Sequence, residues 1–189
     1  LIYDGPFSDH LVTAEPRGVT GDMLDTEQAK QKVVDFFGQD KVNSVEFTDK
    51  IDTDPIKTYT YKASFKNVPE DQTASVSVTQ KGGHVLWMIY DRPVPGEVLN
   101  VEQAKEAGLK FLESRGYKNM VDTYYLKEDN MATVNFAYKQ DDVVVYTDLI
   151  KVKIALDNGE VVGIESKGYL SAHTERNIPK PKITAEEAR

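Results

Sequence analysis

An internal repeat constrains the fold of this chain more than any other feature of its sequence. The segment DTEQAK at residues 25–30 recurs as NVEQAK at residues 100–105, and ITAEEAR at residues 183–189 begins the same pattern again. Each copy places an Asp, Asn or Thr, which can cap a helix N-terminus, three residues before a Gln or Glu. That spacing is typical of a capping box, so each copy predicts the start of a helix.

The residues after each start predict one amphipathic helix followed by strands. Ala29, Val33 and Phe36 form an apolar stripe at helical spacing, and Gly108 takes the place of Val33 in the second copy. That glycine either marks a close approach of helix and sheet or is a tolerated helix residue. Apolar and polar residues then alternate along residues 58–66 and 73–79, which is typical of half-buried antiparallel strands.

Hairpin signals complete each repeat. KGGH at residues 81–84 leads into an apolar strand, and DNGE at residues 157–160 leads into a strand that we expect to span residues 161–169. Each repeat is therefore predicted to be one helix packed on an antiparallel sheet of about four strands. The fold class is α+β, with tandem repeats of the same topology.

Proline and glycine residues divide the chain. We predict an extended N-terminal arm at residues 1–22, a first repeat at 23–94 and a second repeat at 98–170. Residues 171–189 are expected to be a linker and the first helix turns of a truncated third repeat. The arm is too apolar for a free tail, so we expect it to pack on the first repeat.

The strand at residues 85–90, VLWMIY, is apolar on both faces and contains Trp87, the one tryptophan of the chain. A sheet with one wet face cannot bury both sides of such a strand. Either the arm, the second repeat or a partner covers its outer side. We also expect the two repeats to pack together partly through this strand, because units of this size are marginal alone.

Asp148 falls on the apolar face of the strand predicted around residues 144–156. A buried and unpaired carboxylate is expensive, so the pattern has two explanations. A bulge or bend can turn the side chain to the other face. Alternatively, Asp148 is a paired buried acid with a shifted pKa.

Composition and motifs argue against several classes of activity. Thirty-one acidic and 23 basic residues give a formal net charge of −8, which disfavours binding to nucleic acid. There is no cysteine, and the three histidines lack the spacing of a zinc site. Residues 8–10 are Ser, Asp and His, but catalytic triads are recognised by geometry rather than adjacency. The acidic loop at 49–54 lacks the glycine and distal glutamate of a calcium loop. We predict no catalytic, cofactor or metal site.

The repeat resembles the PepSY domain in its EQAK helix start and its G-x-V hairpin strand, seen at residues 83–85 and 159–161. Together with YDGPFSDH at residues 3–10, the chain resembles the C-terminal region of the YpeB family of spore germination proteins. The resemblance implies an extracytoplasmic protein at the spore inner membrane and cortex, held to the membrane only through an upstream anchor absent from this chain. It also implies a partner, the cortex-lytic peptidoglycan hydrolase SleB.

The expected function is therefore that of a non-enzymatic germination protein that binds, stabilises or regulates SleB. The alternative is a module that binds peptidoglycan or a small ligand without a protein partner. Aromatic anchors often dominate interfaces, so Tyr3, Phe7 and Trp87 are the candidate partner-binding residues.

Overall fold

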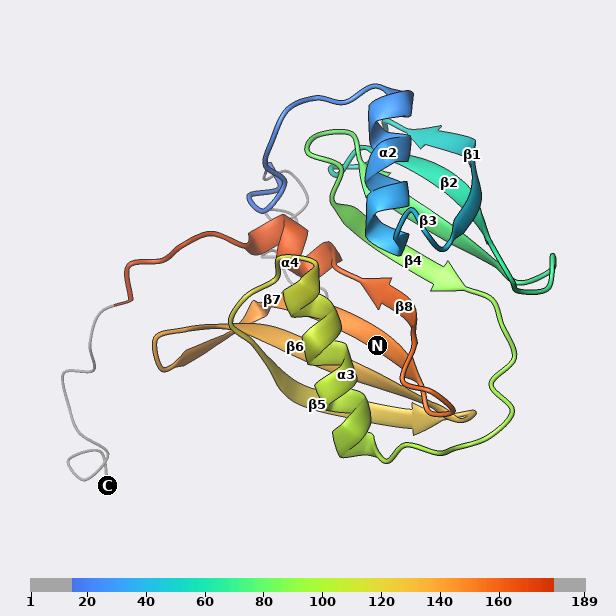
Figure 1. Cartoon of the computed structure of the whole chain (residues 1–189). Helices are drawn as coiled ribbons and strands as arrows, with labels where there is room; N and C mark the ends of the chain where they lie inside the picture. Colours follow the sequence, from blue (N-terminus) through green and yellow to red (C-terminus); the bar gives the residue numbers. More distant parts are fainter. Residues whose placement is uncertain (1–14, 179–189) are drawn as a thin grey trace, which may run out of the picture.

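The computed structural model describes residues 15–178, in which each repeat is a helix followed by four strands (Figure 1). The elements of the first repeat are α2 (Thr26–Phe37), β1 (Val42–Ile51), β2 (Thr58–Phe65), β3 (Thr73–Thr79) and β4 (Val85–Tyr90). Those of the second are α3 (Val101–Ser114), β5 (Met120–Glu128), β6 (Met131–Gln140), β7 (Val143–Ala155) and β8 (Val161–Glu165), followed by the short helix α4 (Lys167–Ala172).

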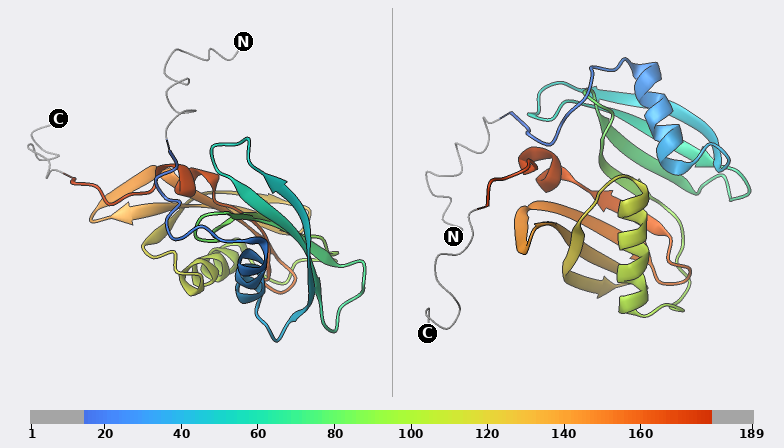
Figure 2. Two further views of the ribbon diagram at one scale, coloured as in Figure 1. Left: turned by 90° about the horizontal axis from the view of Figure 1, so that it is seen from above. Right: turned by 60° about the vertical axis from the view of Figure 1, so that its left-hand side comes forward.

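All eight strands form one antiparallel sheet in the order β1-β2-β3-β4-β8-β7-β6-β5. Each repeat contributes a four-stranded meander, and the last strands of the two meanders pair with each other. Both long helices cover the same face of this sheet (Figure 2). The predicted α+β class, the tandem arrangement and the contact through strand 85–90 are confirmed.

The pairing of β4 with β8 relates equivalent residues of the two repeats. Met88 lies opposite Ile164, which holds the same place in the second repeat, and Trp87 and Ile89 lie opposite Glu165 and Gly163. The equivalent strands β4 and β8 thus pair antiparallel with each other, as two identical strands do across the two-fold axis of a dimer. The repeats are joined by main-chain hydrogen bonds as well as by side-chain packing.

Capping boxes start both helices, as predicted. The Asp25 carboxylate accepts a hydrogen bond from the Gln28 backbone at 2.8 Å, and the Gln28 side chain accepts one from the Asp25 backbone at 3.0 Å. Asn100 and Gln103 repeat this exchange at 2.9 and 3.0 Å. These bonds satisfy helix N–H groups that otherwise lack partners. The third start, at residues 183–189, lies outside the described residues.

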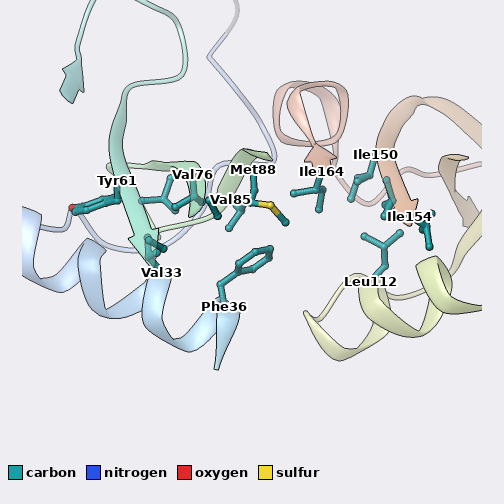
Figure 3. Close-up of a cluster of buried hydrophobic side chains, with 14 of the residues drawn as sticks. Val33, Phe36, Tyr61, Val76, Val85, Met88, Leu112, Ile150, Ile154 and Ile164 are labelled. Atoms are coloured by element: carbon teal, nitrogen blue, oxygen red, sulfur yellow. The ribbon is translucent and has the colours of Figure 1, made fainter. Parts of the chain in front are cut away.

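The core lies between the helices and the sheet (Figure 3). Val33 and Phe36 of α2 and Leu112 of α3 point toward alternate residues of the strands, including Val76 and Ile154. The two helices also touch each other, because the rings of Phe36 and Phe111 lie edge to face at 5.7 Å. One core therefore continues across both repeats.

Gly108 marks a close approach of α3 to the sheet, which decides between the two explanations left open by the sequence. A Cβ atom at this position would lie 2.9 Å from the ring of Phe136 and 3.3 Å from the Ile154 side chain. Real Cβ atoms do not come that near, so only glycine fits here without movement of the ring.

The expected strand at 161–169 is wrong in its second half. β8 ends at Glu165, and α4 crosses the predicted boundary at residue 170. The Ser166 backbone N–H bonds to the Leu86 carbonyl at 2.9 Å, and its hydroxyl donates to the Val85 carbonyl. These contacts with the first repeat turn the chain out of the sheet. They could not be predicted from the alternation of apolar and polar residues along the strand.

The described part of the arm, residues 15–22, contacts both repeats rather than the first alone. The N–H groups of Arg17 and Gly18 bond to the Ser171 and Leu170 carbonyls of α4 at 3.1 and 2.9 Å. The Thr20 carbonyl lies 2.7 Å from the His84 ring in the first repeat. A Cβ at Gly18 would lie 2.6 Å from a backbone oxygen of α4, so glycine permits this crossing.

Arg92 fastens the connection between the repeats to the second one. Its guanidinium forms a two-pronged pair with the Asp157 carboxylate at 2.8 and 2.9 Å and a further bond to Glu160 at 2.7 Å. The Arg92 side chain is only 9% exposed. Paired and shielded from water, this contact is of the strong, geometrically specific type.

Candidate functional site

The outer face of the sheet, opposite α2 and α3, carries two rows of facing residues that each cross all eight strands. One row passes through Trp87 and consists of Asp49, Thr60, Ser77, Trp87, Glu165, Lys151, Asn135 and Tyr124. The other passes through Ile89 and consists of Glu46, Lys62, Ser75, Ile89, Gly163, Lys153, Thr133 and Leu126. Polar side chains dominate both rows, so apolar residues stand out.

Trp87 and Ile89 form an apolar patch at the junction of the two repeats, named here the junction patch. Ile89 is 62% exposed and faces Gly163, which has no side chain to cover it. Trp87 is partly exposed between Ser77 and Glu165. The second repeat pairs with the edge of β4 and does not lie over its outer side. Among residues 15–178, this side of strand 85–90 keeps an open apolar surface.

Tyr124 and Leu126 form a second exposed apolar pair on the outer face, at the far edge strand β5. They are 63% and 52% exposed. Reasoning from the sequence missed this pair. The signal was the run YYL at residues 124–126, which, like strand 85–90, is apolar on both faces. Tyr125 between them faces the helix side, where Lys105 lies over its ring at 5.1 Å.

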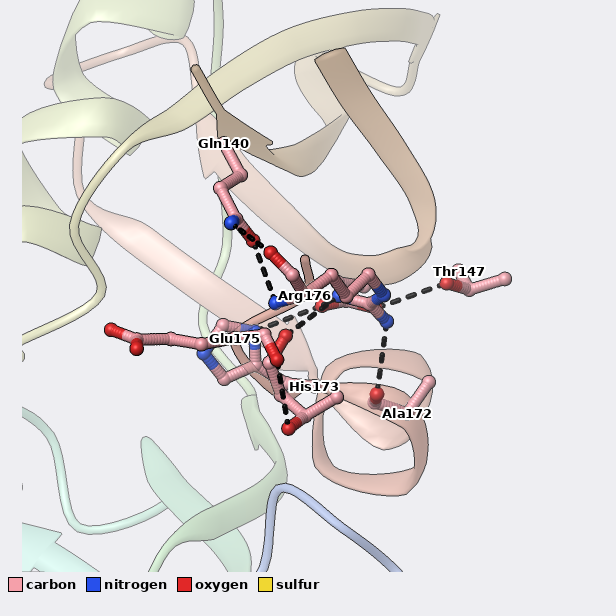
Figure 4. Close-up of polar contacts among 8 residues, drawn as sticks. Gln140, Thr147, Ala172, His173, Glu175 and Arg176 are labelled. Atoms are coloured by element: carbon pink, nitrogen blue, oxygen red, sulfur yellow. Dashed lines mark hydrogen bonds and ion pairs between the residues drawn. The ribbon is translucent and has the colours of Figure 1, made fainter. Parts of the chain in front are cut away.

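Asp148 is fully buried. It is bound by His173 and Arg176 of the segment that follows α4, and both of these side chains are labelled in Figure 4. Arg176 reaches its two carboxylate oxygens at 2.6 and 2.7 Å, and His173 Nδ1 lies 2.9 Å from Oδ2. The Arg176 backbone N–H also bonds to the Gln140 side chain at 3.0 Å. These contacts anchor residues 173–176 against β6 and β7.

Of the two explanations offered for Asp148, the paired buried acid holds, and a bulge is present at this point of the strand as well. The register of β7 against β6 jumps after Ala137, so that Tyr138 faces Val145 while Ala137 faces Leu149. Asp148 lies in the bulge that this jump creates, and it is also a paired acid. Burial alone would raise the pKa of the Asp148 carboxyl, but hydrogen bonds from Arg176 and His173 outweigh it, so the pKa lies below its ordinary value.

Comparison with known proteins places this architecture in a family. The family model for the PepSY1 and PepSY2 domains of YpeB sporulation proteins matches residues 1–179. The chain belongs to the YpeB family. The resemblance read from its helix starts and hairpins is thereby confirmed.

Three curated proteins named sporulation protein YpeB are similar to the chain. The one from Halalkalibacterium halodurans is 35% identical over 114 residues, which is 60% of this chain and 26% of that protein. The Bacillus subtilis protein is 31% identical over 133 residues, 68% of this chain and 29% of that protein. The Oceanobacillus iheyensis protein is 26% identical over 176 residues, 92% of this chain and 38% of that protein. The chain thus spans between a quarter and two fifths of the length of these YpeB relatives.

A solved structure supports the fold. The Bacillus megaterium YpeB C-terminal domain is 27% identical to the chain and superimposes with a TM-score of 0.77, covering 89% of this chain and 74% of that one. A YpeB domain with known coordinates is therefore similar to both repeats and their connection.

Of the three residues predicted to bind a partner, the structure describes one. Tyr3 and Phe7 lie outside the described residues, as do residues 8–10. Trp87 lies on the outer face, where its exposed part is available, and its role in binding stays a prediction.

The described part of the chain shows neither a metal site nor a helix that could span a membrane. There, no group of three or more His, Asp or Glu residues is placed to hold a metal ion. The acidic stretch at 49–54, expected to be a loop, begins inside β1, which runs to Ile51. Its Asp52 pairs with Lys50 at 2.9 Å and accepts a bond from Gln80 at 2.6 Å. Between residues 15 and 178, no helix has the length and apolar character to cross a membrane.

Proposed function

We propose that this YpeB segment belongs to a non-enzymatic spore germination protein that binds the cortex-lytic hydrolase SleB and stabilises or regulates it. Its family membership supports a role in sporulation. The observation that carries the binding role is the junction patch, a partly exposed tryptophan and a largely exposed isoleucine at the centre of a mostly polar sheet face.

The junction patch has the character of a binding hot spot. Aromatic residues near the centre of a flat surface contribute much of the affinity in protein interfaces, while polar neighbours exclude water around them. Lys151 and Glu165 pair at 3.3 Å beside Trp87 and form such a polar border. A protein partner would bury the patch, which the described residues leave open.

The contact of His173 with the buried Asp148 supports a binding role over hydrolysis. Asp and His are residue types that form catalytic acid–base pairs, but Arg176 also binds both oxygens of the Asp148 carboxylate. The pair thus holds a segment of chain in place instead of orienting a base toward a nucleophile. The proposed location is outside the cytoplasm, at the spore inner membrane and cortex.

Gel filtration of the intact protein with purified SleB tests the proposal. Co-elution of the two proteins, together with a changed lifetime or activity of the hydrolase, is the expected result. A Trp87→Ala variant should co-elute less, whereas Lys62→Ala, on the same face of β2, should behave as the unchanged protein. Separate elution with no effect on the hydrolase would contradict the proposal.

The alternative function, direct binding of peptidoglycan or a small ligand, predicts a different outcome. The intact protein alone would then sediment with purified cortex fragments, without any hydrolase present. The proposed function predicts sedimentation only when SleB is added, because the contact with the cortex would come from the hydrolase.

A further inference from the structure

A cleft of about 650 Å³ lies on the helix side of the molecule, where the two repeats and the arm meet. Its volume is in the range of small-ligand sites. The walls come from the arm, α2, the hairpin at 82–84, the end of α3, and α4 with the residues after it. Cationic and aromatic side chains, among them Arg17, Lys32, Arg115, Tyr117 and Tyr169, line the cleft.

The charged groups of the cleft are mostly positive, although the chain as a whole is acidic. Arg17, Lys32 and Arg115 line it, and Glu175 is the one carboxylate among the lining residues. Within residues 15–178, no carboxylate lies at ion-pair distance from any of these three cations. Other arginines of the described chain, such as Arg92, are paired. Cations gathered without counter-charges attract an anion.

Arg115 is the best placed of the three cations. Its guanidinium lies over the rings of Phe36 and Phe111, at 5.2 and 4.9 Å from their centres. These cation–π contacts hold the guanidinium against the two rings and leave N–H groups free to donate hydrogen bonds. The hydrogen bond that its side chain donates within the described chain goes to the Ser114 hydroxyl at 3.0 Å. A guanidinium has five N–H donors, so most remain available for a planar oxyanion.

Aromatic rings also line the cleft. Tyr117 and Tyr169 pack edge to face at 5.2 Å, and the His173 ring stacks on Tyr169 at 4.1 Å. The contact of His173 with Asp148 fixes this stack in turn. A ligand in the cleft would therefore meet a fixed aromatic surface as well as cations.

We propose that this cleft binds a short acidic peptide, with a carboxylate on the edge of Arg115 and an apolar side chain against Tyr117 and Tyr169. Lys32, on a different wall, would take a second carboxylate. A carboxylate matches the planar fork of arginine, and the rings favour an apolar group beside it. The site lies on the helix side of the sheet and does not depend on the proposed hydrolase contact.

Fluorescence anisotropy with a labelled Glu-Phe-Glu-Phe peptide tests the site on the intact protein. Arg115→Met keeps an apolar stem over the two rings but removes the charge, and it should weaken binding roughly tenfold or more. Lys62→Met, on the opposite face of the sheet, is the matched control and should bind as the unchanged protein. Binding should also weaken as salt is raised, because the contacts are partly exposed.

Charge reversal separates recognition from a structural role. Arg115→Glu should lose the acidic peptide and gain affinity for Lys-Phe-Lys-Phe, an exchange that a merely destabilised protein would not show. Equal binding of the uncharged Gln-Phe-Gln-Phe peptide, equal binding by Arg115→Met, or no binding of the acidic peptide at about 1 mM, the weak limit of a useful affinity, would each overturn the proposal.

Discussion

The strands β4 and β8 hold the same place in the two repeats and pair with each other, yet their outer faces differ. Their inner faces are alike, with Met88 opposite Ile164 and both buried. On the outer face, Trp87 and Ile89 in the first repeat correspond to Gly163 and Glu165 in the second. The inner face is constrained by the shared core, while the outer face is free to differ.

This difference shows where a duplicated fold can acquire a new role without loss of stability. The second repeat has an ordinary polar outer face at β8, and the first has a tryptophan and an isoleucine that its own fold does not fully bury. In the helices, the position with a special constraint lies in the second repeat instead of the first. At matching positions, Val33 is an ordinary core residue, whereas Gly108 is forced by the ring of Phe136.

The largest predicted effect concerns a feature of the second repeat alone, the buried Asp148. Asp148→Asn removes the charge that Arg176 and His173 contact, and we expect the free energy of unfolding to fall by about 3 kcal/mol, because one partner of a buried pair is left behind. The matched control is Asp71→Asn in the exposed β2–β3 turn of the first repeat, expected to change it by less than about 0.5 kcal/mol. Urea unfolding of both variants measures this, and equal effects would contradict a special role for Asp148.

A smaller loss is expected when the helix of the second repeat is made like the first. Gly108→Val should lower the free energy of unfolding by about 1–3 kcal/mol, because the added atoms overlap the ring of Phe136. Glu106→Val places the same residue on the exposed side of α3 and should cost only a few tenths of a kcal/mol in helix propensity. Thermal unfolding of the two variants compares them. A stable Gly108→Val protein would show that the helix can move away from the sheet.

The pH dependence of stability should also depend on the second repeat. Hydrogen bonds lower the pKa of Asp148 below about 3.8, and Arg92 lowers that of Asp157 in the same way. A carboxyl with a lowered folded-state pKa stabilises the protein above its ordinary pKa and loses this contribution as the pH falls. Urea unfolding between pH 7 and pH 2 should therefore show stability falling below about pH 4, and falling less in Asp148→Asn. Parallel curves for the two proteins would be the contrary result.

The smallest effect on stability is expected on the outer face of β4. Ile89→Glu copies the residue of the second repeat, and because Ile89 is largely exposed the free energy of unfolding should change by less than about 1 kcal/mol. Met88→Ala, one residue away on the buried face, should cost about 2–5 kcal/mol. Denaturant unfolding measures both. A large loss in Ile89→Glu would mean that the fold itself needs this side chain.

The sequence predicted the elements whose signals are local. Both capping boxes formed, since a cap and its partner lie three residues apart. The predicted packing of the two repeats through strand 85–90 also held, although β8 pairs with the edge of this strand and leaves its outer side uncovered.

What the sequence did not reveal depends on contacts between distant residues. The end of β8 is set by Ser166 bonding to Val85, 81 residues away, and no turn signal marks it. Arg176 binds Asp148 from a stretch expected to be a linker, so its partnership was invisible to periodicity. The cleft was missed for the same reason, because its walls come from five separate segments.

The affinity of the intact protein for SleB, measured with variants of the junction patch, tests the account most directly. Trp87→Ala combined with Ile89→Glu should weaken binding at least about tenfold while the protein stays folded, because the two side chains supply the apolar centre of the interface. Lys62→Ala should leave the affinity unchanged. Undiminished binding by the double variant would contradict the claim that the first repeat, through the outer face of β4, carries the contact with the hydrolase.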